Sequence, residues 1–140
     1  MNISFHFLKP VGLAERARLK SFLLKLAQKE KKKINTLTIV FCSDQYLLQI
    51  NQTYLSHNYY TDIITFDLSD KKSQLIDAEL YISIDRVREN AQLLHTTLKQ
   101  EIHRVVFHGL LHLCGYKDKT PAQEAEMRKM EDKYLSLYFK

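Results

Sequence analysis

The sequence predicts a mixed α/β fold of the α+β type, built as a single domain over residues 1–140. Segments with apolar residues at every second position alternate with longer segments whose apolar residues follow helical spacing. Their order, βαβαββααα, is typical of a small mixed sheet of four strands packed with about five helices. The chain has 140 residues, 45% of them hydrophobic and only three of them glycine, so it can bury one core without long linkers.

The first three elements are a strand, a helix and a strand. Alternating apolar residues predict a strand over 3–8, and Pro10 and Gly12 end it. Helical spacing follows over 13–31. The β-branched, apolar segment 36–42 is typical of a buried strand.

A second helix and two further strands come next. Ser43 or Asp44 can cap a helix that runs to about residue 55. Four of its apolar residues are expected to face the core: Leu47, Leu48, Ile50 and Tyr54. The segments 61–68 and 78–84 are β-branched or alternating, and both predict strands.

Three helices complete the chain. We expect Asp85 to cap a helix that runs to about residue 95, and Thr96 or Thr97 to cap the next helix over 98–114. The last helix begins at Thr120-Pro121, because proline is favoured at the first helical position, and it runs to about residue 137.

Charge and cysteine content indicate a cytoplasmic chain with a polyanionic partner. Lys and Arg outnumber Asp and Glu by 21 to 16, and a net charge of +5 favours nucleic acid. Four of the five residues in 29–33 are lysine; this run is either a solvated helix end or a contact for RNA phosphates. No apolar run is long enough to span a membrane, and the N-terminus lacks a signal-peptide pattern. Cys42 and Cys114 are therefore expected to be reduced thiols.

The most informative pattern is a pair of histidines, His108 and His112, on the helix expected over 98–114. Residues four apart lie on one face of a helix, one turn from each other. Gly115 can end this helix and let the chain bring Asp118 to the same point. Two nitrogens and one carboxylate oxygen around an open fourth position form the ligand set of a catalytic zinc. The sequence therefore predicts a zincin-like metal helix.

The residue after the first histidine sets this site apart from that of a zinc protease. Such proteases have a glutamate there as general base, whereas this chain has Gly109, which leaves room for a strand or a substrate. The general base stays unassigned: Asp62, Asp67 and Glu79 are the candidates, and each also has a structural interpretation.

Two other residues near the pair could be ligands. Cys114 follows the second histidine closely, but it can simply pack at the helix end, and Asp118 has the better spacing. His103 points in a different direction from His108, so we interpret it as a surface residue or one that supports a ligand.

Residues 108–118 have the sequence HGLLHLCGYKD. They resemble the hallmark of the YbeY family of bacterial rRNA-maturation endoribonucleases, which is His-Gly-x-Leu-His-Leu-x-Gly-Tyr-Asp-His. Two further family patterns match upstream: the helix end 50–54 followed by the strand 61–66, and the strand 78–84. Together the three matches cover most of the chain from about residue 40 onward.

The chain departs from the family pattern at three positions. Lys117 and Asp118 stand where the family has aspartate and histidine. Asp118 keeps the ligand spacing, and its carboxylate widens the choice of metal towards manganese. Leu55 replaces an arginine that lines the RNA groove in the family. His57 is either a substitute phosphate contact or a plain surface residue.

The resemblance implies a cytoplasmic, metal-dependent endoribonuclease that cleaves single strands in rRNA maturation and ribosome quality control. It implies one divalent metal ion, first of all Zn²⁺, held by His108, His112 and Asp118, with a metal-activated water as nucleophile. His57, Thr61 and Asp62 would border the groove for substrate. The implied partners are rRNA, the small ribosomal subunit and ribosome-associated proteins.

Two alternatives stay open at this point. One is a metal-dependent hydrolase of another substrate, such as a peptide, although the missing glutamate speaks against it. The other is a non-catalytic ribosome-assembly factor with a structural metal. A structural site has four protein ligands, so a fourth ligand such as Cys114 would favour that alternative.

Overall fold

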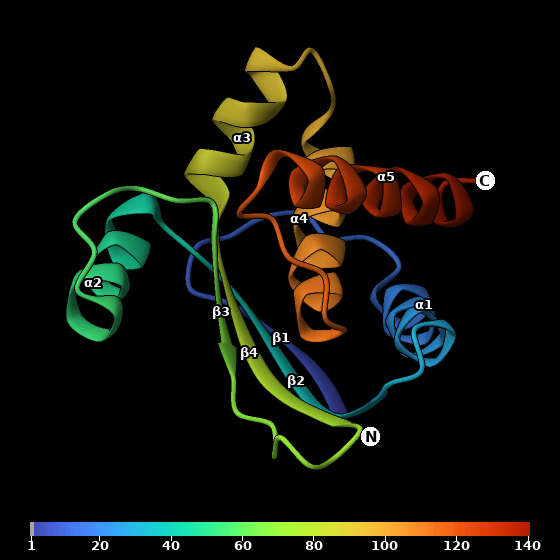
Figure 1. Cartoon of the computed structure of the whole chain (residues 1–140). Helices are drawn as coiled ribbons and strands as arrows, with labels where there is room; N and C mark the ends of the chain where they lie inside the picture. The colour runs from blue at the N-terminus through green and yellow to red at the C-terminus, as the bar shows by residue number, and fades with distance from the viewer. Residues whose placement is uncertain (1) are drawn as a thin grey trace.

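A computed structural model describes residues 2–140 and shows a four-stranded sheet in the order β1-β2-β4-β3 (Figure 1). The strands are β1 (Asn2–Phe7), β2 (Lys33–Cys42), β3 (Ile63–Asp67) and β4 (Leu75–Ser83). β1, β2 and β4 run parallel, whereas β3 pairs antiparallel with β4. The predicted mixed sheet is therefore confirmed.

Five helices cover this sheet, as predicted. They are α1 (Arg16–Lys29), α2 (Asp44–Leu55), α3 (Ile84–Leu93), α4 (Leu98–Leu113) and α5 (Pro121–Tyr138). Helices α1 and α4 pack on one face of the sheet, with α5 against α4, and α2 lies on the other side (Figure 1). The order βαβαββααα is confirmed, and the parallel pair β1 and β2 is joined through helix α1.

Strand β4 supplies the centre of the core. Its buried side chains alternate along the strand and face the helices α1 and α4: Ile76, Ala78, Leu80 and Ile82. A smaller cluster lies on the opposite face of the sheet beneath α2: Cys42, Leu47, Ile50 and Ile64. The strand that carries the main core therefore lies beside the helix that carries both histidines.

Helix α4 approaches the sheet most closely at Gly109. A Cβ atom at this position would lie 2.8 Å from Cδ1 of Ile63 and 2.9 Å from both δ-carbons of Leu80. Real Cβ contacts are essentially never this short, so only glycine fits without a shift of the Ile63 and Leu80 side chains. The room that Gly109 leaves is taken by strands β3 and β4.

The N-terminal cap of helix α3 differs from the prediction. Helix α3 is capped by Ser83, whose hydroxyl accepts from the backbone N–H of Arg86, and not by Asp85. Asp85 instead accepts from the backbone N–H of Asp44 and pairs with Lys9. The cap thus moves by two residues because the Asp85 carboxylate is engaged by the start of α2.

Tyr54 does not face the core; 71% of its surface is exposed. The inward face of α2 ends with Ile50 and Asn51, and the amide of Asn51 donates to the backbone carbonyl of Tyr59. The Tyr54 ring instead lies edge-on to the half-buried ring of Phe66, with centroids 6.0 Å apart. Leu48 is half-buried.

Element boundaries shift most where the sequence lacks a cap signal. Helix α1 starts three residues later than predicted, after Glu15, which has a left-handed φ of 56° and no side-chain cap bond. Strand β2 starts at residue 33 rather than 36. By contrast, the predicted start of α5 is confirmed, and Thr120 and Gln123 form a capping box there.

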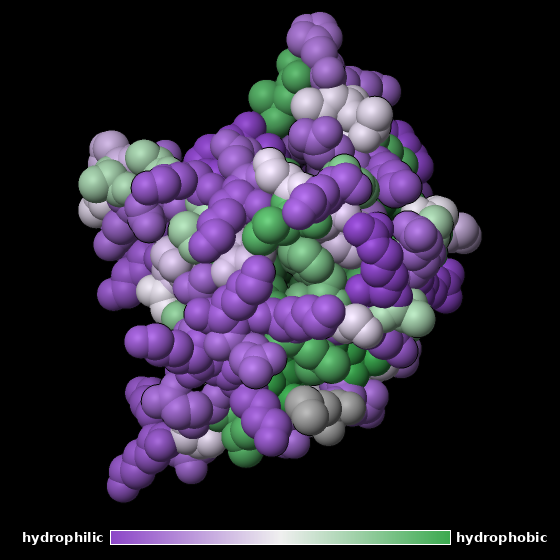
Figure 2. Space-filling model, turned by 90° about the vertical axis from the view of Figure 1, so that its right-hand side faces the viewer, coloured by the Kyte–Doolittle hydropathy of each residue, from purple (hydrophilic) through white to green (hydrophobic). Residues whose placement is uncertain are grey.

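The outer face of α1 and α5 is mostly hydrophilic, with hydrophobic residues gathered in a central band (Figure 2). Within residues 2–140, no helix has the length and apolar character needed to cross a membrane. Of the lysine run, Lys29 ends helix α1 and Lys33 begins β2. Lys32 and Lys33 line a small hollow with residues of α1, away from the histidine pair.

The close approach at Gly109 gives a stability prediction. We expect Gly109→Glu to lower the free energy of unfolding by about 3 kcal/mol or more, because it overpacks the core and buries an unpaired charge. Urea unfolding followed by circular dichroism measures this. The matched control Ala125→Glu, on the exposed side of α5, should stay within about 0.5 kcal/mol of wild type. Equal stability of the two variants would contradict the packing described here.

Candidate metal centre

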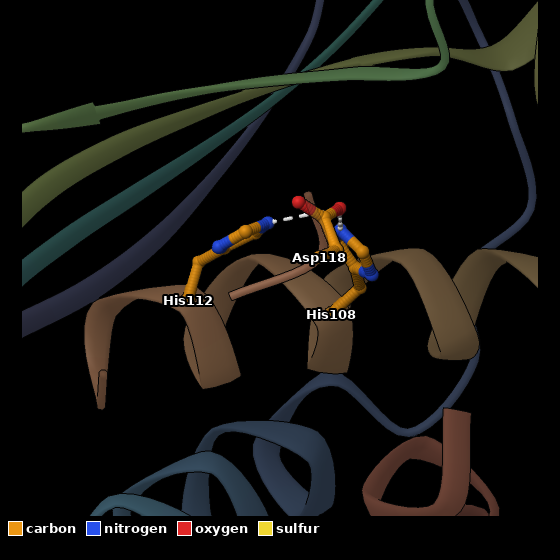
Figure 3. Close-up of side chains that lie close together, drawn as sticks. All are labelled: His108, His112 and Asp118. Atoms are coloured by element: carbon orange, nitrogen blue, oxygen red, sulfur yellow. Dashed lines mark ion pairs between the residues drawn. The ribbon is translucent and has the colours of Figure 1, made fainter. Parts of the chain in front are cut away.

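His108, His112 and Asp118 converge on one point, as the sequence predicts (Figure 3). The Nε2 atoms of His108 and His112 lie 3.2 Å and 3.3 Å from the same oxygen of Asp118, Oδ2. One potential ligand atom from each residue lies within 4.8 Å of the others. The three side chains are half-buried, so an ion held here would still be reached from solvent.

These distances fit a divalent metal ion. Ligand bonds of about 2.0–2.1 Å in a tetrahedron put neighbouring ligand atoms about 3.3 Å apart, which matches both measured nitrogen–oxygen distances. In the described part of the chain, His, Cys, Asp and Glu side chains supply no fourth member of the group. The arrangement therefore leaves one coordination position open, as catalytic sites do.

The turn after α4 explains how Asp118 reaches the histidines. Gly115 has a φ of 110°. Its backbone N–H donates to the carbonyl of His112, and the backbone N–H of Tyr116 donates to the carbonyl of Leu111. These two bonds form a Schellman motif, which ends the helix and reverses the chain. Gly115 thus has the role that its position in the sequence predicts.

The loop that carries Asp118 is anchored on both sides. Before it, the hydroxyl of Tyr116 donates to Glu30 at the end of α1, over 2.8 Å. After it, the side chain of Gln123 accepts from the backbone N–H groups of Lys119 and Thr120. Because both ends of the short loop are held, the Asp118 carboxylate is placed before any metal binds.

A residue that the sequence analysis missed, Glu131 on α5, orients the first ligand. Nδ1 of His108 donates to Oε2 of Glu131 over 2.6 Å, which leaves Nε2 directed towards Asp118. The other Glu131 oxygen accepts from Arg104 over 3.0 Å. A carboxylate behind a ligating histidine fixes the ring and its tautomer and raises its basicity.

The sequence holds a signal for this pairing. Glu131 is only 5% exposed and lies on the apolar stripe of α5, beside Met127 and Tyr134. On α4, Arg104 precedes His108 by one turn, so the two polar residues share a face with each other. A buried carboxylate on one helix and a buried cation on another indicate a pair, although spacing alone does not say which helices meet.

Charges around His108 shift its pKa. Burial alone would lower the pKa of His108, but the hydrogen bond and charge of Glu131, with the charges of Asp62 and Asp118, raise it above the ordinary value. The buried His103 behaves in the opposite way, since burial lowers its pKa below the ordinary value. The two histidines on one helix thus differ in their affinity for a proton.

Two hollows meet at the candidate metal centre. The first has a volume of about 380 Å³, lies between α3, α4 and α5, and is lined in part by Arg104 and Arg128. The second, of about 440 Å³, lies between β3, α4 and the loop after α2. Asp62, His108 and Asp118 line both hollows. A long substrate could therefore contact the protein on both sides of the metal.

The three candidate bases separate clearly in space. Asp62 lies beside His108, and burial raises the pKa of its carboxyl above the usual range, although the charge of His108 opposes this shift. Asp67 also lines the second hollow, but it is exposed at the far end of β3 and accepts from the backbone N–H of Ser69. Glu79 lies in a different hollow and accepts from Tyr81. Asp62 is therefore the candidate that the structure brings to the metal centre.

The residues expected to border a substrate groove all line the second hollow. They are His57, Thr61 and Asp62, and Leu55 lies among them. The His57 ring stacks on Tyr59 and is exposed on the loop between α2 and β3. Thr61 is half-buried and its hydroxyl donates to the carbonyl of Ile63.

Two residues near the histidine pair lie outside the ligand group. Cys114 is a free, half-buried thiol, and burial raises its pKa to about 12, which disfavours the thiolate that a metal needs. Of the two interpretations of His103, that of a surface residue is wrong, because it is only 2% exposed. Its ring stacks on Tyr138 and bonds the carbonyl of Lys99, because its helix face points to α5 rather than to β3.

Fold and site together define a class: a mixed-sheet protein with a histidine pair and an aspartate that could hold a metal ion on the helix beside the sheet. The family model described as Endoribonuclease YbeY matches residues 12–138. The chain belongs to the YbeY family.

Individual relatives agree with this assignment. Endoribonuclease YbeY of Cytophaga hutchinsonii is 55% identical over 125 residues, which are 89% of this chain and 87% of that protein. Endoribonuclease YbeY of Flavobacterium psychrophilum is 41% identical over 136 residues, 97% of this chain and 96% of that protein. The solution structure of TM1509 from Thermotoga maritima has a TM-score of 0.68 at 25% identity, covering 99% of this chain and 89% of that one.

The contact between Glu131 and His108 gives a prediction for metal affinity. We expect Glu131→Gln to weaken Zn²⁺ binding by about 10- to 100-fold, because the amide no longer supplies the negative charge behind the ring. Competition titration with a chromogenic chelator measures the change. Glu126→Gln on the exposed side of α5 is the control and should bind Zn²⁺ as the wild type does. Wild-type affinity in Glu131→Gln would show that the contact does not support the ligand.

An NMR titration of the metal-free protein measures the opposite pKa shifts of His108 and His103. His108 should titrate above the ordinary value of 6.5 and His103 below it. Protonation of His108 therefore stabilises the metal-free fold below the unfolded pKa, and this contribution is lost as the pH rises through the folded pKa. For His103 the contribution is present above the unfolded pKa and is lost as the pH falls through the folded one. Titration of both rings at one pH would refute the assigned surroundings.

Proposed function

We propose that this chain, acting as one YbeY-like domain over residues 1–140, is a metal-dependent endoribonuclease that cleaves single-stranded RNA during rRNA maturation and ribosome quality control. One observation carries the proposal: two histidine nitrogens lie at tetrahedral spacing from one oxygen of Asp118, at the place where two hollows meet. The names of the relatives support RNA as substrate. We propose His108, His112 and Asp118 as the ligands and Zn²⁺ as the metal.

When bound, the metal would polarise a phosphodiester and bring the pKa of a water molecule towards neutrality. The residues of this chain have separate tasks. Asp62, with its raised pKa and its place beside His108, accepts the proton that the attacking water loses. Glu131 holds the His108 ring so that its Nε2 faces the open position.

Phosphates flanking the cleaved bond need cations near the metal centre. Arg128 is exposed and lines the first hollow, and Lys117 and Lys119 lie on either side of Asp118 in the loop. These side chains would bind the RNA backbone, so binding should weaken as the salt concentration rises. Together with the net charge of +5, they support rRNA in the small ribosomal subunit, with its associated proteins, as the partner.

The two alternatives fit the site less well. A peptidase of the zinc-protease type needs a glutamate at position 109, where even a Cβ would overlap Ile63 and Leu80. A structural metal needs a fourth protein ligand, and the neighbouring thiol of Cys114 is not part of the ligand group. The free thiols Cys42 and Cys114 support the cytoplasm as the place of action.

A ribonuclease assay tests the proposal. Wild-type protein loaded with Zn²⁺ should cleave a single-stranded rRNA fragment within the strand and leave its duplex form intact. His112→Ala should lose at least about 100-fold in rate, because a ligand to the metal is removed. Chelation should abolish cleavage and Zn²⁺ should restore it.

Each outcome of this assay has a clear meaning. Equal cleavage by wild type and His112→Ala, after rigorous repurification, would refute the assignment of the active site. Recovery with Mn²⁺ but not Zn²⁺ would refute zinc and leave the nuclease in place. Arg88→Ala, an exchange of a surface cation on α3 outside both hollows, is the control for a nonspecific loss of charge.

A further inference from the structure

The second hollow beside the metal centre has a composition that suits a nucleobase rather than a phosphate. The described residues that line it include no Lys or Arg. Beyond the ligand Asp118, it contains the carboxylates of Asp62 and Asp67, which would repel a phosphate. Carboxylates line the first hollow too, and its Arg104 is buried and paired with Glu131 and Asp132. The first hollow also has the exposed cation of Arg128, however, so a phosphate of a bound strand would meet a cation there and not in the second hollow.

The mouth of the second hollow holds a flat aromatic pair. The rings of His57 and Tyr59 stack with their centroids 5.1 Å apart and an interplanar angle of 23°. The hydroxyl of Tyr59 lies 3.0 Å from Nδ1 of His57, so the two rings are also joined by a hydrogen bond. More than half of the Tyr59 surface, 56%, is exposed. Both side chains are exposed, so the pair offers aromatic surface to a ligand.

The loop that carries this pair is held in place. Asn51, only 1% exposed, donates from its side chain to the carbonyl of Tyr59 over 2.8 Å. The backbone N–H of His57 donates back to the carbonyl of Asn51 over 3.1 Å. Gln52 donates to the side chain of Asn58 over 2.6 Å. A platform that is fixed in advance loses less conformational entropy when it binds a ligand.

We infer that His57 and Tyr59 form a stacking subsite for one unpaired nucleobase of the RNA strand whose phosphate lies at the metal. The polar groups of Thr61 and Thr65 in the same hollow can meet the edge of that base, and Leu55 adds an apolar wall. The inference rests on the proposed function and gives His57 a base contact instead of a phosphate contact.

This subsite would explain a preference for single strands. A base inside a duplex has both faces covered by its neighbours and cannot lie against the pair unless it leaves the helix. An unpaired base offers a free face, and one aromatic partner contributes enough to matter for affinity. Selection of single strands would then come from stacking at His57 and Tyr59 as well as from access to the metal.

The test uses a short single-stranded 2′-O-methyl RNA in which 2-aminopurine replaces one base at a time, with the Zn²⁺-loaded protein. At one position the fluorescence should be quenched by stacking. His57→Ala and Tyr59→Ala should remove this quenching and weaken binding by roughly 5- to 150-fold, the loss expected for one stacked base. Tyr59→Phe keeps the ring and should bind as wild type.

Two controls make the result specific. Tyr54→Ala removes an exposed tyrosine of α2 that lines a different hollow, and it should change neither quenching nor affinity. An abasic nucleotide at the quenched position should weaken wild-type binding as much as Tyr59→Ala does, and the two changes together should cost no more than one. Circular dichroism and zinc content establish that each variant is folded and loaded.

The outcomes separate this inference from the proposed function. Wild-type quenching and affinity in both alanine variants, or losses that add up with the abasic nucleotide, would overturn the stacking subsite. If RNA is still cleaved in that case, the nuclease stands without it. Quenching that depends on Tyr59 in a protein that cleaves no RNA would confirm the subsite and overturn the nuclease.

Discussion

The approach of helix α4 to strands β3 and β4 at Gly109 is the contact on which the rest of the structure depends. With no side chain between helix and sheet, the turn that carries His108 and His112 lies directly beside β3. The same approach brings Asp62, at the start of that strand, to the histidines and shapes both hollows. A larger residue would overlap the side chains of Ile63 and Leu80 and disturb the packing that places this turn, so packing and chemistry share one constraint.

A buried chain of charges connects this helix to the C-terminal helix. Arg104 lies between Glu101 on its own helix and two acidic residues of α5, Glu131 and Asp132. Buried charges are costly unless they are paired and hydrogen-bonded. One oxygen of Glu131 accepts a hydrogen bond from Arg104 and the other accepts one from His108. The pairing that makes burial tolerable thus also fixes the orientation of a metal ligand. Stability of the α4–α5 contact and metal affinity are coupled for this reason.

The site keeps the histidine pair of a zinc protease but distributes the other roles differently. The position of the usual glutamate is used for helix–sheet packing, and the carboxylate of Asp62, the residue just before β3, lines the site instead. The proposed third ligand is an aspartate on a loop that a Schellman turn and a capping box hold at its two ends. The two hollows beside the candidate metal centre also differ: Arg104 and Arg128 line the first, whereas the second has no Lys or Arg and contains the aromatic pair of His57 and Tyr59.

The sequence by itself determined the features that depend on local geometry. The order of elements, the spacing of His108 and His112 on one helix face and the reversal at Gly115 follow from neighbouring residues, because helical periodicity and turn preferences act over a few positions. Caps without a clear signal, as at Asp85, and inward faces, as at Tyr54, were predicted wrongly because they depend on which element packs alongside. Only the tertiary structure decided that Glu131 supports His108, that Asp62 rather than Glu79 lies at the metal centre, and that Gly109 meets the sheet. These contacts join segments far apart in the chain, and no local periodicity encodes which distant side chain will fill a given space.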